Sequence, residues 1–231
     1  MTCPWGRSNA LGIDSFCEQV RTCAWVLQPA NAASAVAFLI VTVAFLWQAH
    51  KSGMRILLAL AACSGLLALG TAAQHITGTR WGMLLDYTGM QSMNVLMACV
   101  GLRRWQGGSW RTLAAIGVLI WVVLILLTAM FDSVRRTVMV AGMVPCAALE
   151  LRLWFRDGTR TNYRWFFIGW LLFVVAVVAW IVDSKGWVCA PQSVLQLHAL
   201  WHVSTAAALL AWGAYYRQFR GLQPRRQWRQ T

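Results

Sequence analysis

The stretch TLAAIGVLIWVVLILLTAMF, residues 112–131, decides the fold, because it is uncharged and long enough to cross a lipid bilayer. A transmembrane α-helix needs about 20 such residues. Lipid offers backbone groups no hydrogen-bond partners, so an apolar run of this length is expected to be helical. The sequence therefore predicts an all-α integral membrane protein, a bundle of seven transmembrane helices. Six further apolar runs flank the first, and they cover residues 32–49, 54–74, 83–102, 137–155, 165–182 and 193–216.

The composition supports a membrane protein and excludes a soluble domain. Hydrophobic residues make up 59% of the chain and charged residues only 12%, whereas soluble domains carry about 25% charged residues. The net charge of +13 is high, but the basic residues lie in short clusters between apolar runs, so nucleic acid is not an expected partner. We predict a single membrane domain over 1–231, with an external segment 1–31, the bundle 32–216 and a basic cytoplasmic tail 217–231.

Lys and Arg also predict the orientation, because they are enriched in cytoplasmic connections. The predicted connections alternate between two sides of the membrane, and fourteen of the 20 basic residues lie on the side opposite the N-terminus. We therefore expect an external or periplasmic N-terminus and a cytoplasmic C-terminus. The six basic residues on the external side are Arg7, Arg21, Arg80, Arg135, Arg136 and Lys185.

Four of the seven cysteines agree with this orientation. Cys3, Cys17, Cys23 and Cys189 all fall on the predicted external side, where an oxidising environment permits disulfides. We predict a disulfide between Cys17 and Cys189, which leaves Cys3 and Cys23 as the second pair. Spacing alone does not decide the connectivity.

Ionisable side chains inside a membrane are costly, so those that occur there are candidates for function. His75 lies at the external end of the second predicted span, and Asp86 lies one turn into the third. His198 and His202 lie in the first turns of the seventh span, four residues apart and so on one helix face. Thr71 is one turn before His75. The three histidines and Asp86 are expected in one layer near the external surface, and the Thr71 hydroxyl can point into the same cavity.

Three histidines with an open fourth position are typical of catalytic zinc sites. Asp86 would move protons, and the Thr71 hydroxyl would help to hold an oxyanion. Other interpretations stay open for each residue: the histidines could bond neighbouring helices or bind haem, Asp86 could pair with Arg80, and Thr71 could bond its own helix. Glu150, the other acid within a span, is expected to snorkel or to form a local ion pair.

The site segments TAAQH (71–75), LD (85–86) and QLHALWH (196–202) resemble the Ser-xxx-His, Asp and His-xxx-His motifs of the alkaline ceramidase family. That family belongs with the adiponectin-type receptors in a superfamily of seven-helix membrane hydrolases. The N-terminal segments FCE (16–18) and QPANAAS (28–34) resemble two further motifs of the family. The resemblance extends from about Asp14 to His202.

The resemblance implies a zinc-dependent hydrolase that cleaves the N-acyl amide of ceramide, or of a similar lipid, to a fatty acid and a sphingoid-type amine. Zinc would be held by His75, His198 and His202. The chain departs from the family in carrying Thr71 where the motif has Ser. The substrate would be a membrane lipid that arrives from the outer leaflet.

The family also has an N-terminal calcium site, for which this chain lacks an expected acid because Gln28 stands in its place. Since calcium needs six to eight oxygen ligands, no tight calcium site is predicted. A weak site at Asp14, Glu18 and Asn31 stays open.

Two other classes of function stay open. The first is a seven-helix lipid receptor or binding protein with a structural zinc ion and little hydrolysis. The second is a transporter, although a transporter would need polar residues along a whole path, whereas here they gather at one end.

Overall fold

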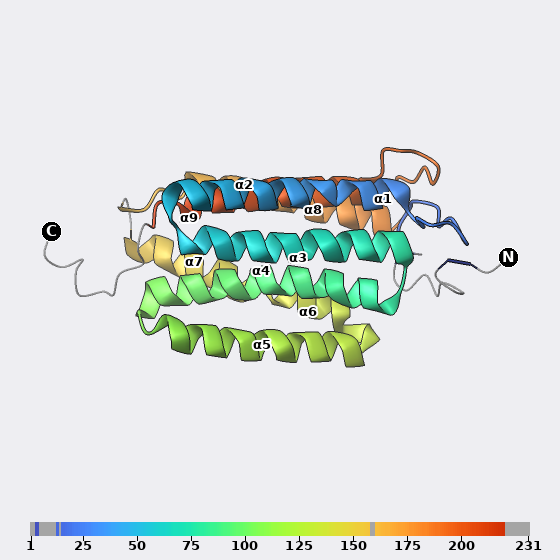
Figure 1. Ribbon diagram of the computed structural model, residues 1–231. Helices are drawn as coiled ribbons and strands as arrows, with labels where there is room; N and C mark the ends of the chain where they lie inside the picture. The colour runs from blue at the N-terminus through green and yellow to red at the C-terminus, as the bar shows by residue number, and fades with distance from the viewer. Residues whose placement is uncertain (1–2, 5–12, 14, 158–159, 220–231) are drawn as a thin grey trace, which may run out of the picture.

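The structure, a computed structural model, describes residues 3–4, 13, 15–157 and 160–219, and its regular secondary structure there is entirely helical. The long helices lie side by side, and their connections alternate between two opposite ends (Figure 1). In chain order the elements are α1 (Pro29–Ser34), α2 (Val36–Ser52), α3 (Arg55–Thr77), α4 (Arg80–Gln106), α5 (Trp110–Met130), the short 3₁₀ helix η1 (Asp132–Val134), α6 (Arg135–Ala141), α7 (Met143–Asp157), α8 (Arg164–Ser184) and α9 (Leu197–Tyr216).

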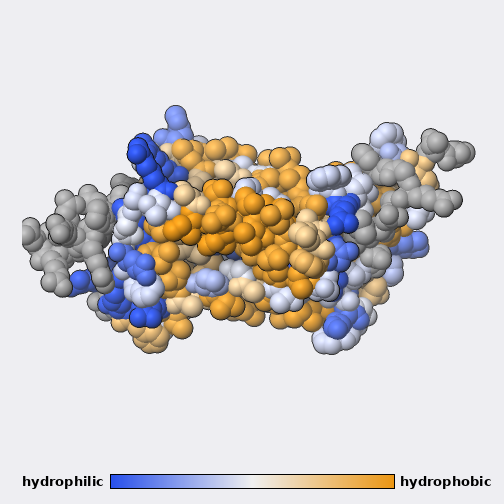
Figure 2. All heavy atoms as spheres, turned by 90° about the horizontal axis from the view of Figure 1, so that it is seen from below, coloured by the Kyte–Doolittle hydropathy of each residue, from blue (hydrophilic) through white to orange (hydrophobic). Residues whose placement is uncertain are grey.

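The face of the molecule drawn in Figure 2 carries a broad hydrophobic band between two hydrophilic ends. Within the described residues, five helical segments are long and apolar enough to cross a membrane, which is typical of a multi-pass membrane protein. The all-α membrane class predicted from the sequence is therefore confirmed. The five segments are Pro29–Ser52, Arg55–Thr77, Trp110–Met130, Asp132–Arg156 and Arg164–Ser184.

Helices α4 and α9, which occupy the other two predicted spans, are not among these five segments. Both are long enough, with 27 and 20 residues. Helix α4 is less apolar because it carries Asp86, Gln91 and Asn94, and α9 because it carries two histidines and several Trp and Tyr residues. Helix α9 is packed within the bundle, against α1, α2 and α8.

Two predicted spans differ in detail from the helices observed. The span predicted over 137–155 is broken at Gly142 into α6 and α7. Pro145 explains the break, because proline lacks the N–H that would continue the helical hydrogen bonding and its ring crowds the preceding turn. The span predicted over 193–216 becomes helical only at Leu197.

Helices α3 and α4 form a closely packed hairpin. The turn between them needs Gly78, whose φ of 58° is left-handed, and the Thr79 side chain then caps α4 by accepting from the Gly82 N–H at 3.2 Å. Along the pair, Gly70 lies directly against the backbone of Asp86: a Cβ on Gly70 would be 2.5 Å from the Asp86 nitrogen. Small residues at such contacts let helix backbones approach closely.

The N-terminal segment 15–28, which we call the strap, lies at the end of the bundle where α3 and α8 end and α9 begins. We call this end the histidine end. The predicted Cys17–Cys189 disulfide is present and ties the strap to the α8–α9 connection, and Cys3–Cys23 forms the second disulfide. The Gln19 N–H also donates to the Pro191 carbonyl at 3.0 Å.

A buried ion pair lies at the opposite end. Arg104 on α4 donates to Glu150 on α7 at 2.6 Å, and the Tyr215 hydroxyl on α9 donates to the same carboxylate at 2.6 Å. The Arg104 and Glu150 side chains are only 5% and 2% exposed. Glu150 therefore joins three helices, and the expectation of a snorkelling residue or a local pair is wrong.

Candidate metal and hydrolytic site

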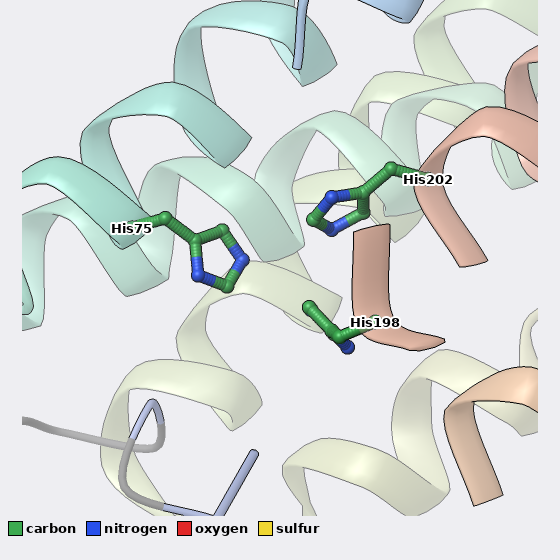
Figure 3. A group of neighbouring side chains, drawn as sticks. All are labelled: His75, His198 and His202. Atoms are coloured by element: carbon green, nitrogen blue, oxygen red, sulfur yellow. The ribbon is translucent and has the colours of Figure 1, made fainter. Parts of the chain in front are cut away.

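Three buried histidines converge at the histidine end. His75 comes from the last turns of α3, and His198 and His202 come from successive turns at the start of α9 (Figure 3). One ligand atom from each ring lies within 4.8 Å of those from the other two. The sequence predicted this convergence from the four-residue spacing and from the expected layer.

The His75 ring is oriented by Gln28. Its Nδ1 lies 2.8 Å from the Gln28 Oε1. The Gln28 amide nitrogen donates to the carbonyls of Ile13 and Glu18, both at 2.9 Å, so the amide oxygen must face the histidine. The His75 Nδ1 therefore carries the proton, and Nε2 keeps the lone pair that a metal ligand needs.

The His202 ring is oriented in the same way by Ser34. The Ser34 Oγ lies 2.6 Å from Nδ1 of His202. It also donates its single proton to the Asn31 carbonyl at 2.6 Å, so towards the histidine it acts as the acceptor. Nε2 of His202 is again left with its lone pair.

His198 is held differently. The Phe16 ring stacks on its imidazole, with centroids 3.6 Å apart and planes 22° from parallel. Its backbone N–H donates to Asp183 Oδ1 at 3.2 Å, and Asp183 Oδ2 accepts from the Cys17 N–H at 3.1 Å. Asp183, which is 1% exposed, therefore fixes both the strap and the first turn of α9.

The site suits a metal ion. Nδ1 of His198 is buried, and it has no hydrogen-bond partner among the described residues. A buried polar atom without a partner is costly unless something binds to it or near it. Neutral imidazoles are ligands that zinc prefers, and three of them match the donor set of a catalytic zinc site.

Asp86 lies in the same cavity as the histidines, and the volume of this cavity is about 320 Å³. The Thr71 hydroxyl donates to the Asp86 Oδ1 at 2.6 Å. Thr71 is not among the described residues that line the cavity, and in this structure its hydroxyl proton goes to the Asp86 carboxylate. Arg80, the alternative partner considered for Asp86, donates instead to the Ala129 carbonyl.

Of the residues considered for calcium, Glu18 has other partners. The Glu18 carboxylate accepts from the Ala30 and Asn31 N–H groups at 2.7 and 2.8 Å and so caps the start of α1. The Asn31 side-chain nitrogen donates to the Gln28 Oε1 at 3.3 Å, whereas the Asn31 Oδ1, the atom that could bind calcium, has no hydrogen-bond partner among the described residues. Asp14 lies outside the described residues. The described contacts therefore give Glu18 a capping role.

The sequence did not reveal the residues that orient the histidines. Gln28 and Ser34 stand in a segment that drew attention only through the family resemblance. Asp183 lies one residue beyond the predicted span 165–182 and had no visible partner in the sequence. Its role depends on contacts with the strap and α9, which are distant in the chain.

The protein is thus a helical membrane protein in which three convergent, buried histidines, a group that could hold a metal ion, lie beside a half-buried carboxylate. The chain matches the ceramidase family over residues 15–230. Because this match covers nearly the whole chain, the protein belongs to the ceramidase family, and the resemblance noted in its sequence is confirmed. Membership implies a hydrolase acting on amide bonds of a lipid substrate. A comparison with curated proteins found no match.

Proposed function

We propose that the protein is a zinc-dependent membrane amidohydrolase that cleaves the N-acyl amide of ceramide or a ceramide-like lipid. The products would be a fatty acid and a sphingoid-type amine. The observation that carries this proposal is the convergence of three buried histidines and one carboxylate, Asp86, in a single cavity. Membership of the ceramidase family supports the amide bond as the target.

His75, His198 and His202 would hold the zinc ion. A zinc ion bound in this way supplies Lewis acidity, which makes hydroxide accessible near neutral pH. Gln28 and Ser34 keep two of the rings in the tautomer that a ligand needs.

Asp86 would accept the proton of the attacking water and deliver it to the leaving nitrogen. This second transfer is needed because an amide anion is a very poor leaving group. Thr71 acts as a positioning residue: its hydrogen bond to Oδ1 fixes the carboxylate and leaves Oδ2 to carry the proton.

We further propose that α4 and α9 also cross the membrane, which would make seven spans. Helix α4 joins α3 to α5, two membrane-spanning candidates, and runs between their opposite ends (Figure 1). Helix α9 likewise starts where α8 ends and returns to the other end. With the orientation predicted from Lys and Arg, the histidine end would face outward, and the lipid would enter from the outer leaflet.

The test measures metal content and turnover on the same purified protein. We expect about one zinc ion per chain, and fatty acid release from ceramide that a chelator abolishes and zinc restores. His202→Ala should lose most of the zinc, whereas Asp86→Asn should keep the zinc and lose turnover. An active Asp86→Asn enzyme would contradict the role of Asp86. Zinc-loaded protein that binds ceramide without cleaving it would instead indicate a lipid receptor.

A further inference from the structure

Two arginines line the same cavity as the histidines. Arg135 and Arg136 are the first residues of α6, the short helix that precedes the break at Gly142. We call these two residues the arginine pair. No step of the proposed hydrolysis uses them. The inference drawn from them rests on the proposed function, because it concerns the lipid that this cavity takes.

The charge of the arginine pair is only partly balanced by its neighbours. Arg135 donates to the Asp132 carbonyl at 3.2 Å, and its guanidinium lies 3.6 Å from the Asp132 carboxylate, which is 61% exposed. A further Arg135 N–H contacts the sulfur of Met83, a weak acceptor. Arg136 donates to the neutral Ser15 hydroxyl at 3.1 Å. Within the described contacts, two guanidinium charges therefore share one exposed carboxylate.

Arg104 shows how this chain uses an arginine for structure. Its guanidinium donates to both oxygens of Glu150, at 2.7 and 2.6 Å, and to the Tyr215 hydroxyl at 2.7 Å. The arginine pair has no comparable set of acceptors in the described residues. It lies beside the reaction cavity with donors that can still bind an oxyanion.

We propose that the arginine pair binds an oxyanion, a phosphate or a carboxylate, on the amine side of the lipid. The preferred substrate is then an N-acyl lipid with an anionic headgroup, in place of neutral ceramide. Guanidinium groups suit this task because they bind phosphate and carboxylate through paired, charge-assisted hydrogen bonds.

The headgroup fits this position better than the fatty acid does. The carboxylate of the fatty acid forms where the amide is cleaved, beside the histidines and Asp86 on α3, α4 and α9. The arginine pair belongs to a different element, α6, and so can contact a second group of the same lipid.

The test compares ceramide 1-phosphate with ceramide of the same acyl chain, in mixed micelles at equal surface concentration. We expect the zinc-loaded wild-type enzyme to have the higher kcat/KM on the phosphorylated lipid. In Arg136→Gln, the ratio of the two kcat/KM values should fall about tenfold or more, since a hydrogen bond to a charged group contributes about 1.5–3 kcal/mol.

Arg80→Gln is the matched control. Arg80 lies at the same end of the bundle and bonds a backbone carbonyl, but it is not among the described cavity-lining residues. Its replacement removes one positive charge and should leave the ratio unchanged. If the ratio of the two kcat/KM values fell equally in Arg80→Gln, the effect would come from general surface charge, and the proposal would be overturned. So would a wild-type enzyme without preference for the phosphorylated lipid.

Lipid binding to the Asp86→Asn variant tests the arginine pair even if the protein shows no turnover. Equilibrium binding of fluorescent ceramide 1-phosphate should be tighter than that of fluorescent ceramide, and Arg136→Gln added to Asp86→Asn should remove the difference. If wild type cleaves neither lipid but this difference is seen, the proposed hydrolysis fails and the anion site stands. If Arg136→Gln only relieves inhibition by free fatty acid, the pair holds the product, and the headgroup assignment is wrong.

Discussion

At the scale of single residues, the three histidines are each held by a different kind of contact. A Gln28 amide oxygen, a Ser34 hydroxyl and a stacked Phe16 ring orient them one by one. These contacts come from the strap and α1, which lie far from the histidines in the chain. The rings are thus oriented by the protein itself, which would lower the entropy lost when the proposed metal ion binds.

Ser34→Ala tests this orientation. The substitution removes the acceptor for the Nδ1 proton of His202, and we expect zinc affinity to fall about 10- to 100-fold. Competition with a chelator of known affinity measures it. Ser64→Ala is the control, because Ser64 is a buried serine that bonds Thr42 and the Ala61 carbonyl. An unchanged affinity in Ser34→Ala would show that Ser34 does not orient His202.

Asp183 gives a second residue-scale prediction. In Asp183→Ala, the Cys17 and His198 N–H groups lose their acceptors inside the protein, so the free energy of unfolding should fall by about 1–3 kcal/mol. Zinc affinity should fall as well, because this contact holds His198 in the first turn of α9. Asp183→Asn keeps one acceptor oxygen and should recover part of both losses. Thermal unfolding measures the loss of stability, and competition with a chelator measures the loss of zinc affinity. If Asp183→Asn lost as much of both as Asp183→Ala does, the hydrogen bonds of Asp183 would not have the role described.

At the scale of elements, the hairpin of α3 and α4 sets the distance between Thr71 and Asp86. Gly70 precedes Thr71 and lies directly against the backbone of Asp86. This contact explains why two residues on different helices form a hydrogen bond of 2.6 Å. The position of the Asp86 carboxylate therefore depends on a glycine that carries no functional group.

Gly70→Ala should separate the two helices at this point. Its methyl group would lie 2.5 Å from the Asp86 nitrogen, so backbone must move, and we expect about 1–3 kcal/mol of destabilisation together with loss of turnover. Gly65→Ala, on the same helix, is the control, because its methyl group would meet Thr42 at an ordinary 3.4 Å. Unfolding midpoints measure the destabilisation, and ceramide hydrolysis measures the loss of turnover, in both variants. A fully active Gly70→Ala enzyme would show that this close approach is not needed.

The sequence predicted the elements well where hydrocarbon burial alone dictates them. Apolar runs such as 112–131 became helices with bounds within a few residues of those expected. The prediction was weaker where a single residue competes with that rule, as at Pro145, which breaks a continuous apolar run. It also placed the start of α9 too early, because residues 193–196 belong to the connection after the disulfide.

The site was predicted to a similar extent. Spacing and depth were enough to bring His198 and His202 together with His75 and to place Asp86 beside them. The contact of Thr71 with Asp86 was missed, because it depends on the rotation and close approach of two helices. The rotation and the close approach of α3 and α4 are set by the packing of Gly70 against Asp86, and no sequence motif indicates this packing.

At the scale of the whole molecule, the two ends of the bundle differ in chemistry. The histidine end holds the candidate site, both disulfides and the strap, whereas the opposite end holds the buried pair Arg104–Glu150. Figure 2 shows the hydrophobic band that separates them. The orientation predicted from Lys and Arg would place the disulfides on the oxidising side.

Single cysteines introduced at the two ends test the orientation. Lys185→Cys lies at the histidine end, and Ser109→Cys lies in the connection between α4 and α5 at the other. A membrane-impermeant maleimide should label Lys185→Cys in intact cells and Ser109→Cys only after permeabilisation. The wild-type protein, whose free cysteines Cys63, Cys99 and Cys146 lie within helices, is the background control. The reverse pattern would invert the proposed topology.

The packing of α9 against α1 and α2 also affects when the enzyme can become active. Two of the three proposed metal ligands are on α9, whereas the groups that orient them are on the strap and α1, which the ribosome makes much earlier. A chain that still lacks α9 therefore cannot assemble the full proposed ligand set. Assembly of the candidate site therefore waits for the synthesis of α9.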